Sequence, residues 1–334
     1  MFYSNCRLFK IMEIEIKIDN EDVVNSSVDN ILPLVSIIVI TYNSSKYVLE
    51  TLESTKAQTY SKIELIITDD CSKDNTVEIC RNWIVENKER FVDAKLIVNE
   101  KNSGTTANCN RGLGVANGKW IKLIAGDDIL LPNCIDSFLE FISRHKNCSI
   151  VFGRMYYLKK NMLIEDKVNT FFKNTPSEQK LKIYTGSGLS APASFIKHSL
   201  INECGGFNEN YKLIEDVPMW ISISRRDEYF YFLNTFVVKY RLHSTNVSMT
   251  KGVYVNPNYY FDLRRLIMLE IFPELLHLKQ YVAYFNYWNY IKITDLIIAI
   301  GNRNNYLSKF LNLLILKNSY EFLNRAILLL KKVE

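Results

Sequence analysis

The chain has 334 residues, of which 48% are hydrophobic and 23% charged, so we expect a globular protein rather than a disordered one. The net charge of +5 is modest, and residues 258–334 carry ten Lys and Arg against six Asp and Glu. Because most of the surplus lies in this last segment, the main part of the chain does not have the basic surface of a nucleic-acid-binding protein.

The apolar runs and the cysteines indicate in which compartment the protein lies. No apolar run reaches the ~18 residues of a membrane-spanning helix, and the N-terminus has no apolar signal-peptide core. Seven cysteines, none paired as CxxC, favour free thiols in a reducing compartment over disulfides or a zinc site. We therefore expect a cytoplasmic protein.

The chain opens with an N-terminal extension, residues 1–32, to which we assign no function. Apolar runs at 35–40, 63–68, 95–98 and 120–124 then predict four strands. Helical patterns follow each of them, at 46–58, 77–84, 107–116 and 132–144. A continuous β-branched run such as 35–40 suits a parallel strand buried on both faces. The alternation predicts an α/β fold with a doubly wound, mostly parallel sheet and flanking helices.

The pattern changes after a strand-like segment at 149–153. We expect residues 176–192 to form a loop, because prolines and the Gly186-Ser-Gly188 sequence interrupt them. Residues 193–201 predict a short strand and helix, a helix starts within 213–220, and 229–242 predict another strand. The rest, 259–332, reads as a helical C-terminal extension with two apolar stripes. The stripes are Leu307, Phe310, Leu311, Leu314 and Ile315, and then Phe322, Leu323, Ala326, Ile327 and Leu330.

Two acids, Asp127 and Asp128, directly follow the predicted strand at 120–124. Ligands of open α/β sheets bind at the carboxyl ends of the strands. Hard divalent cations such as Mg²⁺ and Mn²⁺ bind through carboxylates and substrate phosphates. The pair therefore indicates a metal–diphosphate site, although an acidic turn after a strand would have the same sequence.

Five motifs stand together in order along the chain. They are 35–43, Asp69-Asp70-Cys-Ser with Asp74, Asn102-Ser-Gly104 with Asn108 to Gly112, Gly126-Asp-Asp128, and Glu215-Asp216 ahead of Trp220. This ordered set resembles the family 2 glycosyltransferases of the bacterial surface-polysaccharide type, inverting enzymes with the GT-A nucleotide-sugar fold.

The resemblance covers residues 33–245 and implies a domain organisation. A GT-A catalytic domain would span 33–250, with a nucleotide-binding half at 33–130 and an acceptor half at 131–250. Residues 251–334 would form the helical C-terminal region.

The resemblance also implies a donor site for a nucleotide-diphosphate sugar. Because Asp70 is implied to bind uracil, we expect the donor to be a UDP-sugar. Asp70 would accept a hydrogen bond from the uracil imide. The alternative is that its charge only stabilises the N-terminus of the following helix. Arg111 would reach the diphosphate or support the Asp127 loop, and an ordinary surface residue is the alternative. The remaining donor-binding residues implied are Thr41, Tyr42, Asn43, Asn108 and Asp127.

A divalent metal, Mn²⁺ or Mg²⁺, is implied by the Gly-Asp-Asp sequence. Asp128 would be the direct ligand, while Asp127 would contact the ribose or a metal-bound water. His243 follows the last strand, where relatives often carry a histidine, and would be a further metal or diphosphate contact. A histidine satisfied within the fold is the alternative.

Asp216 is implied as the catalytic base that takes the proton of the acceptor hydroxyl. We expect the helix N-terminus at this position to keep its carboxylate ionised. Glu215 is the adjacent carboxylate and could take the same role, but the position of the acid in the family's motif favours Asp216. A helix-capping Asp is the alternative.

The family analogy extends to the acceptor and the location. The acceptor would be a saccharide, polyprenyl-diphosphate-linked, in O-antigen or capsule biosynthesis. The C-terminal helices would either pack on the domain or make a peripheral contact with the inner face of the cytoplasmic membrane. Two other functions were weighed. An inactive nucleotide-sugar or glycan-binding module remains the alternative, whereas a nucleotidyltransferase needs a Gly-rich basic loop that residues 41–45 do not provide.

Overall fold

The computed structural model describes residues 32–160, 162–186, 188–243 and 253–318, and the N-terminal extension lies outside them. Nine strands form one sheet in the order β3-β2-β1-β4-β8-β6-β9-β5, with β7 paired to β6. The strands are β1 (Val35–Thr41), β2 (Ile63–Asp69), β3 (Asp93–Val98), β4 (Trp120–Ala125), β5 (Ile129–Leu130), β6 (Ile150–Lys159), β7 (Met162–Glu165), β8 (Ser194–Lys197) and β9 (Tyr231–Leu242).

The first four strands are parallel and aligned in register. Val35 of β1 pairs with Ile63 of β2 and with Trp120 of β4, so the three strands end side by side. The prediction of a mostly parallel sheet is confirmed, but β8, β7 and β5 run antiparallel to their neighbours. β5 and β7 were not predicted because they are too short to show a period.

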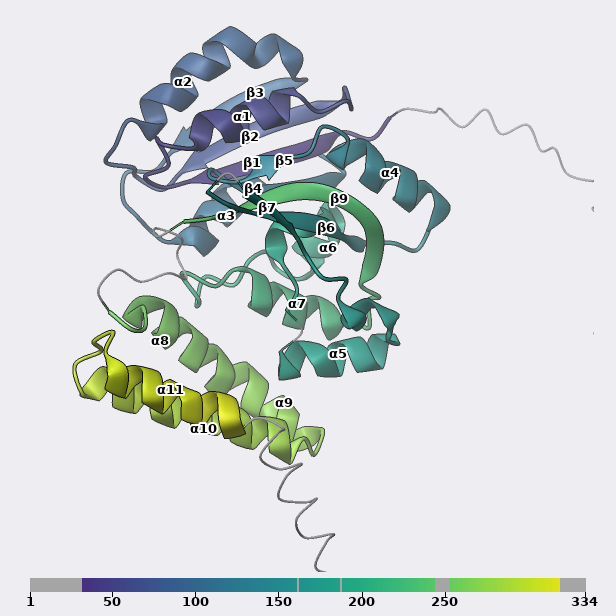
Figure 1. The fold of residues 1–334 in the computed structure, drawn as a ribbon. Coiled ribbons are helices and arrows are strands. Elements are labelled where there is room, and N and C mark those ends of the chain that lie inside the picture. Colours follow the sequence, from purple (N-terminus) through teal and green to yellow (C-terminus); the bar gives the residue numbers. More distant parts are fainter. Residues whose placement is uncertain (1–31, 161, 187, 244–252, 319–334) are drawn as a thin grey trace, which may run out of the picture. The chain divides into compact units, whose positions relative to one another are not determined.

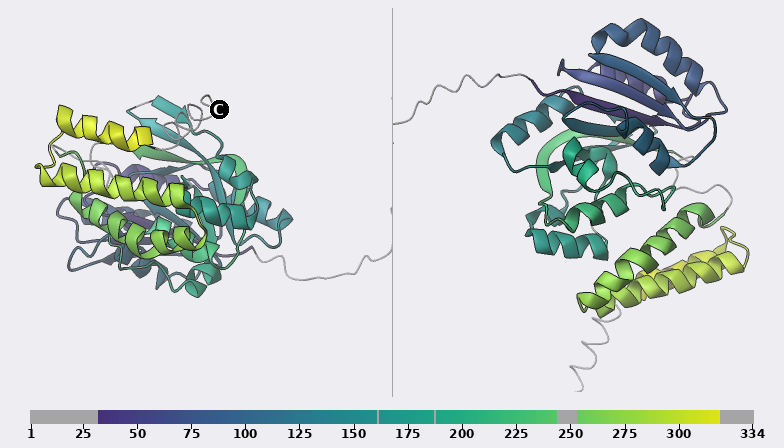
Figure 2. Two further views of the ribbon diagram at one scale, coloured as in Figure 1. Left: turned by 90° about the horizontal axis from the view of Figure 1, so that it is seen from below. Right: turned by 180° about the vertical axis from the view of Figure 1, so that it is seen from behind.

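Helices cover both faces of the sheet, as expected for a doubly wound fold (Figures 1 and 2). On one face, α1 and α4 pack on the odd-numbered residues of β1, among them Ile37 and Val39. On the other face, α3, α6 and α7 pack against Ile38 and Ile121. The helices are α1 (Val48–Lys56), α2 (Thr76–Asn87), α3 (Thr105–Leu113), α4 (Cys134–Arg144), α5 (Pro176–Thr185), α6 (His198–Glu203) and α7 (Asp216–Ser224).

A further set of helices follows the last strand, as predicted. They are α8 (Pro257–Leu266), the π-helical turn η4 (Ile267–Ile271), α9 (Phe272–His277), α10 (Tyr281–Ala299) and α11 (Tyr306–Asn318). Leu266, Leu275 and Ile291 share a buried core with Trp220 of α7, so α8, α9 and α10 pack against α7. Leu307 and Phe310 of the first predicted stripe are exposed on α11. The second stripe lies outside the described residues.

The predicted loop at 176–192 is wrong in its first half, where the chain forms α5. Thr175 caps the helix by accepting from the Glu178 main-chain N–H, and the Glu178 side chain accepts from the Thr175 N–H. Pro176 stands at the first helical position, and Gly186 ends the helix in a left-handed conformation. The same proline and glycine that indicated a loop therefore mark the two ends of a helix.

A buried polar cluster joins β1, β2 and the turn before β4. Ser36 donates to Glu64 at 2.5 Å, and the Gly118 N–H donates to both side chains at 2.8 and 2.9 Å. The turn can only approach this closely without a side chain, since a Cβ on Gly118 would lie 2.4 Å from the Ser36 main-chain nitrogen.

We therefore expect Gly118→Ala to lower the free energy of unfolding by about 2 kcal/mol or more, because main-chain atoms cannot move aside cheaply. Urea unfolding would measure the change. Gly205→Ala is the matched control for the added methyl, since nothing lies within 4 Å of that position, although its φ of +82° adds backbone strain of its own. A smaller loss in Gly118→Ala than in Gly205→Ala would contradict this account.

Candidate functional site

The acidic motifs lie where β2, β1 and β4 end next to one another. The Asp70 N–H donates to the carbonyl oxygen of Thr41, the last residue of β1, and the Gly126 N–H donates to the Ile40 carbonyl. The loops that carry Asp70 and Asp127-Asp128 thus flank the end of β1 on its two sides. This is the edge at which a parallel sheet binds its ligands.

Asp70 is buried and surrounded by donors. Its carboxylate accepts from the main-chain N–H groups of Ser103 and Gly104 at 2.8–3.0 Å. The Arg111 guanidinium donates to it at 3.2 Å and the Asn99 amide at 3.3 Å. These four groups match the roughly four lone-pair positions of a carboxylate. The structure thus brings Asp70 and Arg111 together, a pairing that the sequence did not predict.

Asn108 and the loop after β1 complete this region. The Asn108 amide donates to the carbonyls of Thr41 and Thr68 at 3.3 and 3.0 Å, and its oxygen accepts from Arg111. Asn108 therefore ties β1 to β2 rather than standing free in a pocket. Tyr42 is 48% exposed, and Asn43 has a positive φ of 51° and accepts from the Lys73 N–H. The exposed Tyr42 ring is available to a ligand.

Asp127 and His243, implied separately as site residues, are in direct contact. The His243 Nε2 lies 2.8 Å from Asp127 Oδ2, with both side chains partly exposed. Arg241, two residues earlier on the same face of the chain, donates its Nε–H to the Asp127 carbonyl and its main-chain N–H to Asp128 Oδ1. Arg241 also pairs with Glu50 at 2.7 Å.

Arg241 was not predicted as a site residue. It contacts both acids at 2.8 Å and so orients the loop that carries them. A strand places residues 241 and 243 on the same face. This spacing could have identified Arg241 from the sequence once His243 was a candidate.

Asp128 is fully buried, and one of its oxygens lacks a partner. Oδ1 accepts from the Arg241 N–H at 2.8 Å, whereas Oδ2 has no hydrogen bond. Burial, followed by the neighbouring Asp127 charge, raises the pKa of this carboxyl well above its usual range. A buried unpartnered carboxylate oxygen costs free energy unless a cation or donor binds it.

The residues present fit a divalent cation that is bound jointly with a ligand. Among the described residues, no group of three or more His, Cys, Asp or Glu side chains is arranged to hold a metal. Mg²⁺ commonly binds through one or two carboxylates plus substrate phosphates, and the free Oδ2 of Asp128 suits that mode.

Glu215 and Asp216 lie at the start of α7, against β4. Together with Ile121, Leu123 and Trp220 they line a small hollow of about 10 Å³. Asp216 accepts from the Val217 main-chain N–H at 2.7 Å. Leu123 is two residues before the end of β4. Asp216, the candidate base, therefore lies against the strand that leads to Asp127 and Asp128.

The helix N-terminus does not lower the pKa of Asp216 below its ordinary value. Burial raises the pKa of Asp216 and outweighs the hydrogen bonds from main-chain N–H groups. Burial and the adjacent Asp216 charge raise the pKa of Glu215 to about 8. Both acids therefore bind a proton more tightly than an unconstrained carboxyl, and the Glu215 pKa lies in the range in which a general base works.

These raised values predict a pH dependence of stability. A Glu215 pKa of about 8 in the folded state, against 4.5 for the unconstrained side chain, means that the folded state binds the proton more tightly. Its contribution to stability is complete below pH 4.5 and is lost as the pH rises to 8. Glu215→Gln removes this loss, so its free energy of unfolding relative to the wild type should increase with pH across that range. Urea unfolding at several pH values measures it, and a difference that is flat or falls with pH would refute the prediction.

Comparisons with known proteins identify the family. The family model described as Glycosyl transferase family 2 matches residues 36–205. A protein of Rickettsia prowazekii described as uncharacterized glycosyltransferase RP339 is 27% identical over 230 residues, covering 65% of this chain and 67% of the relative. Glycosyltransferase GlyG of Streptococcus pneumoniae is 32% identical over 123 residues, 37% of this chain and 39% of that protein.

Solved structures show the same fold. S. aureus TarS 1-349 superposes with a TM-score of 0.57 at 20% identity, covering 86% of this chain and 81% of that one. Its complex with UDP-GlcNAc gives a TM-score of 0.55 at 21% identity, with coverages of 70% and 66%. The chain spans 43% of another TarS chain. The predicted fold, a mixed α/β architecture with a parallel-rich sheet, flanking helices and C-terminal helices, is confirmed.

Proposed function

This chain belongs to glycosyltransferase family 2 and is a glycosyltransferase, and we propose that it transfers a sugar from UDP to a saccharide with inversion and with a divalent cation. The observation that carries this proposal is the unpartnered, fully buried Oδ2 of Asp128, next to Asp127 and His243 at the ligand-binding edge of the sheet. When bound there, Mn²⁺ or Mg²⁺ would neutralise the charge of the diphosphate leaving group.

The proposed base is Asp216. In a single displacement with inversion, a carboxylate removes the proton of the attacking hydroxyl on the face opposite the leaving group. The elevated pKa of the Glu215–Asp216 pair supports this role, because a carboxylate that holds its proton more tightly is a stronger base.

UDP is the proposed leaving group, since TarS has been solved with UDP-GlcNAc, and Asp70, directly after β2, is the acid proposed to bind the base. Four donors already surround that carboxylate, so a uracil N–H must replace one of them. We propose that the Asn99 amide, the most distant of the four at 3.3 Å, is the donor that gives way. Tyr42, exposed beside it, would border the uracil ring. Arg111, paired with Asp70, would contact the diphosphate.

The proposed acceptor is a growing bacterial surface glycan, of the O-antigen or capsule type, carried on a polyprenyl diphosphate at the inner face of the cytoplasmic membrane. The structure contains no helix long and apolar enough to cross a bilayer among the described residues. Apolar side chains exposed on α8 to α11 support a peripheral contact, because such residues insert at the headgroup boundary. They include Phe261, Leu269, Phe285, Trp288 and Phe310.

A donor screen tests the proposal directly. The full chain is incubated with UDP-, GDP- and dTDP-sugars and a mixture of glycoside acceptors, with Mn²⁺, Mg²⁺ or EDTA, and released nucleoside diphosphate is measured. We expect turnover with a UDP-sugar that EDTA abolishes. Turnover with GDP- or dTDP-sugars alone would overturn the role of Asp70, and UDP binding without turnover would favour the inactive module.

A further inference from the structure

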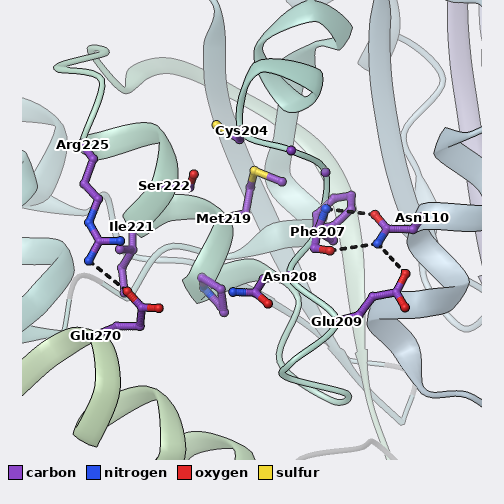
Figure 3. A pocket seen from close by; sticks show the side chains of 13 residues that line it. Asn110, Cys204, Phe207, Asn208, Glu209, Met219, Ile221, Ser222, Arg225 and Glu270 are labelled. Atoms are coloured by element: carbon purple, nitrogen blue, oxygen red, sulfur yellow. Dashed lines mark hydrogen bonds and ion pairs between the residues drawn. The ribbon is translucent and has the colours of Figure 1, made fainter.

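A second, larger hollow lies away from the acidic edge of the sheet (Figure 3). It encloses about 430 Å³ between α7, the turn after α6, and residues Asn110 and Glu270. Its charged side chains already have partners, since Arg225 pairs with Glu270 at 2.9 Å and Glu209 accepts from Asn110 at 2.8 Å. The four aspartates proposed for the site, all in the described part of the chain, lie elsewhere. The side chains that extend the site belong instead to α1.

One face of α1 contacts the loop that carries Asp127 and Asp128. Four residues at the spacing i, i+3, i+4 and i+7 share this face, namely Tyr47, Glu50, Thr51 and Ser54. Thr51 donates to the Asp128 carbonyl at 2.7 Å, and Ser54 accepts from the Leu130 N–H at 3.1 Å. Glu50 pairs with Arg241 at 2.7 Å. The helix therefore holds this loop, and the end of β9 beside it, in place.

Tyr47 contributes an aromatic ring to this face. It directly precedes α1 and belongs to the loop after β1, so it lies at the carboxyl edge of the sheet. The His243 imidazole centroid lies 4.9 Å from the Tyr47 ring centroid, with 31° between the two planes. The Arg241 guanidinium carbon lies over the same ring, 4.6 Å from its centroid. Both distances fall in the range of favourable aromatic and cation–π contacts.

The two side chains on this ring also contact the acidic loop. His243 Nε2 lies 2.8 Å from Asp127 Oδ2, and the Arg241 Nε–H donates to the Asp127 carbonyl at 2.8 Å. The side chains of His243 and Arg241 are each 14% exposed, so the neighbouring groups decide their positions. An imidazole turns about two side-chain torsions, and an aromatic ring packed beside it restricts both. Tyr47 therefore limits the orientations in which His243 meets Asp127.

We propose that Tyr47 is a positioning residue that holds the His243 imidazole against Asp127 and thereby supports joint binding of the cation and the donor diphosphate. The proposal rests on the function proposed above, because it takes Asp127 and His243 as parts of the donor site. The contacts with His243 and Arg241 are made by the ring of Tyr47. Phenylalanine should therefore replace tyrosine at this position, whereas leucine should not.

Proton NMR of the full chain, labelled at its histidines, tests the geometry without donor or metal. A nearby aromatic ring shifts the resonances of the carbon-bound imidazole protons, and His243→Asn identifies those of His243 among the four histidines. We expect these resonances to move in Tyr47→Leu and to stay close to their wild-type positions in Tyr47→Phe. Tyr281→Leu, which removes an exposed tyrosine of α10, is the matched control and should leave them unchanged.

Calorimetric titration with UDP tests the consequence for binding. With Mn²⁺, we expect Tyr47→Leu to raise the dissociation constant about 3- to 10-fold, which corresponds to the loss of one aromatic contact. In EDTA this variant should bind UDP as the wild type does, because the uracil contacts come from another loop. Tyr47→Phe and Tyr281→Leu should match the wild type in both conditions. In a His243→Asn background, Tyr47→Leu should add less than about twofold, because its effect passes through His243.

If the wild type responds to Mn²⁺, any of four results overturns the role of Tyr47. They are unmoved His243 resonances in Tyr47→Leu, wild-type UDP binding in that variant, an equal loss of binding in Tyr47→Phe, and a loss that persists in the His243→Asn background. A wild type that binds UDP equally with Mn²⁺ and in EDTA would instead refute the cation of the proposed function, and this role with it.

Discussion

Asp216→Asn should reduce sugar transfer by about 10²–10⁴-fold while leaving the dissociation constant for UDP unchanged. The amide has nearly the same shape and can still accept from the Val217 N–H, so α7 keeps its start. It cannot take a proton from the acceptor hydroxyl. Steady-state release of UDP in the presence of acceptor measures the loss, and calorimetry measures UDP binding.

The same substitution at the neighbouring acid decides between the two candidates. Glu215→Gln changes an equally buried carboxylate in the same hollow, and we expect it to lose much less activity than Asp216→Asn. The reverse order would assign the base to Glu215. Wild-type activity in Asp216→Asn would contradict the proposed mechanism.

Asp128→Ala should abolish transfer through a different defect, the loss of metal-dependent donor binding. In the wild type we expect Mn²⁺ to lower the dissociation constant for UDP. The ratio of the constants without and with Mn²⁺ should be at least about tenfold smaller in the variant. UDP binding in EDTA should be equal in both proteins, since the uracil contacts are formed by another loop. Calorimetric titrations with and without Mn²⁺ give both values.

Stability separates this loss of binding from misfolding. The buried Asp128 carboxyl has one unpartnered oxygen, so its removal relieves a desolvation cost while it removes the hydrogen bond from the Arg241 N–H. We therefore expect a melting temperature close to that of the wild type. Asp93→Ala, at the exposed start of β3, is the matched control and should keep the full effect of Mn²⁺. An equal effect of Mn²⁺ in Asp128→Ala would refute the assignment of the metal ligand.

The sheet could be predicted because its parallel strands are continuous apolar runs. Residues 35–40 and 63–68 are buried on both faces, so apolar side chains prevail in their sequence and the polar exceptions are Ser36, Glu64 and Thr68. α5 could not be predicted by composition, because Pro176 and Gly186 occur equally in loops and at helix ends. β5, of two residues, exists only through its pairing with β9.

The acids proposed for the site stand out in the sequence, but their environments do not. That Asp70 is saturated with donors while Asp128 has a free oxygen depends on Ser103, Gly104 and Arg241, which tertiary folding brings to them. Burial at the start of α7 likewise outweighed the local effect of the helix on Asp216. The larger hollow joins segments about 160 positions apart, from Asn110 to Glu270, and no local pattern predicts it.

The central claim is that the end of the sheet, the Asp128 oxygen and Asp216 form one sugar-transfer site. Diffraction at the manganese absorption edge from crystals grown with Mn²⁺ and a non-hydrolysable UDP-sugar tests it most directly. We predict an anomalous peak within coordination distance of Asp128 Oδ2 and the diphosphate, with uracil at Asp70 and the anomeric carbon facing Asp216. A peak bound elsewhere, or a sugar turned away from Asp216, would contradict it.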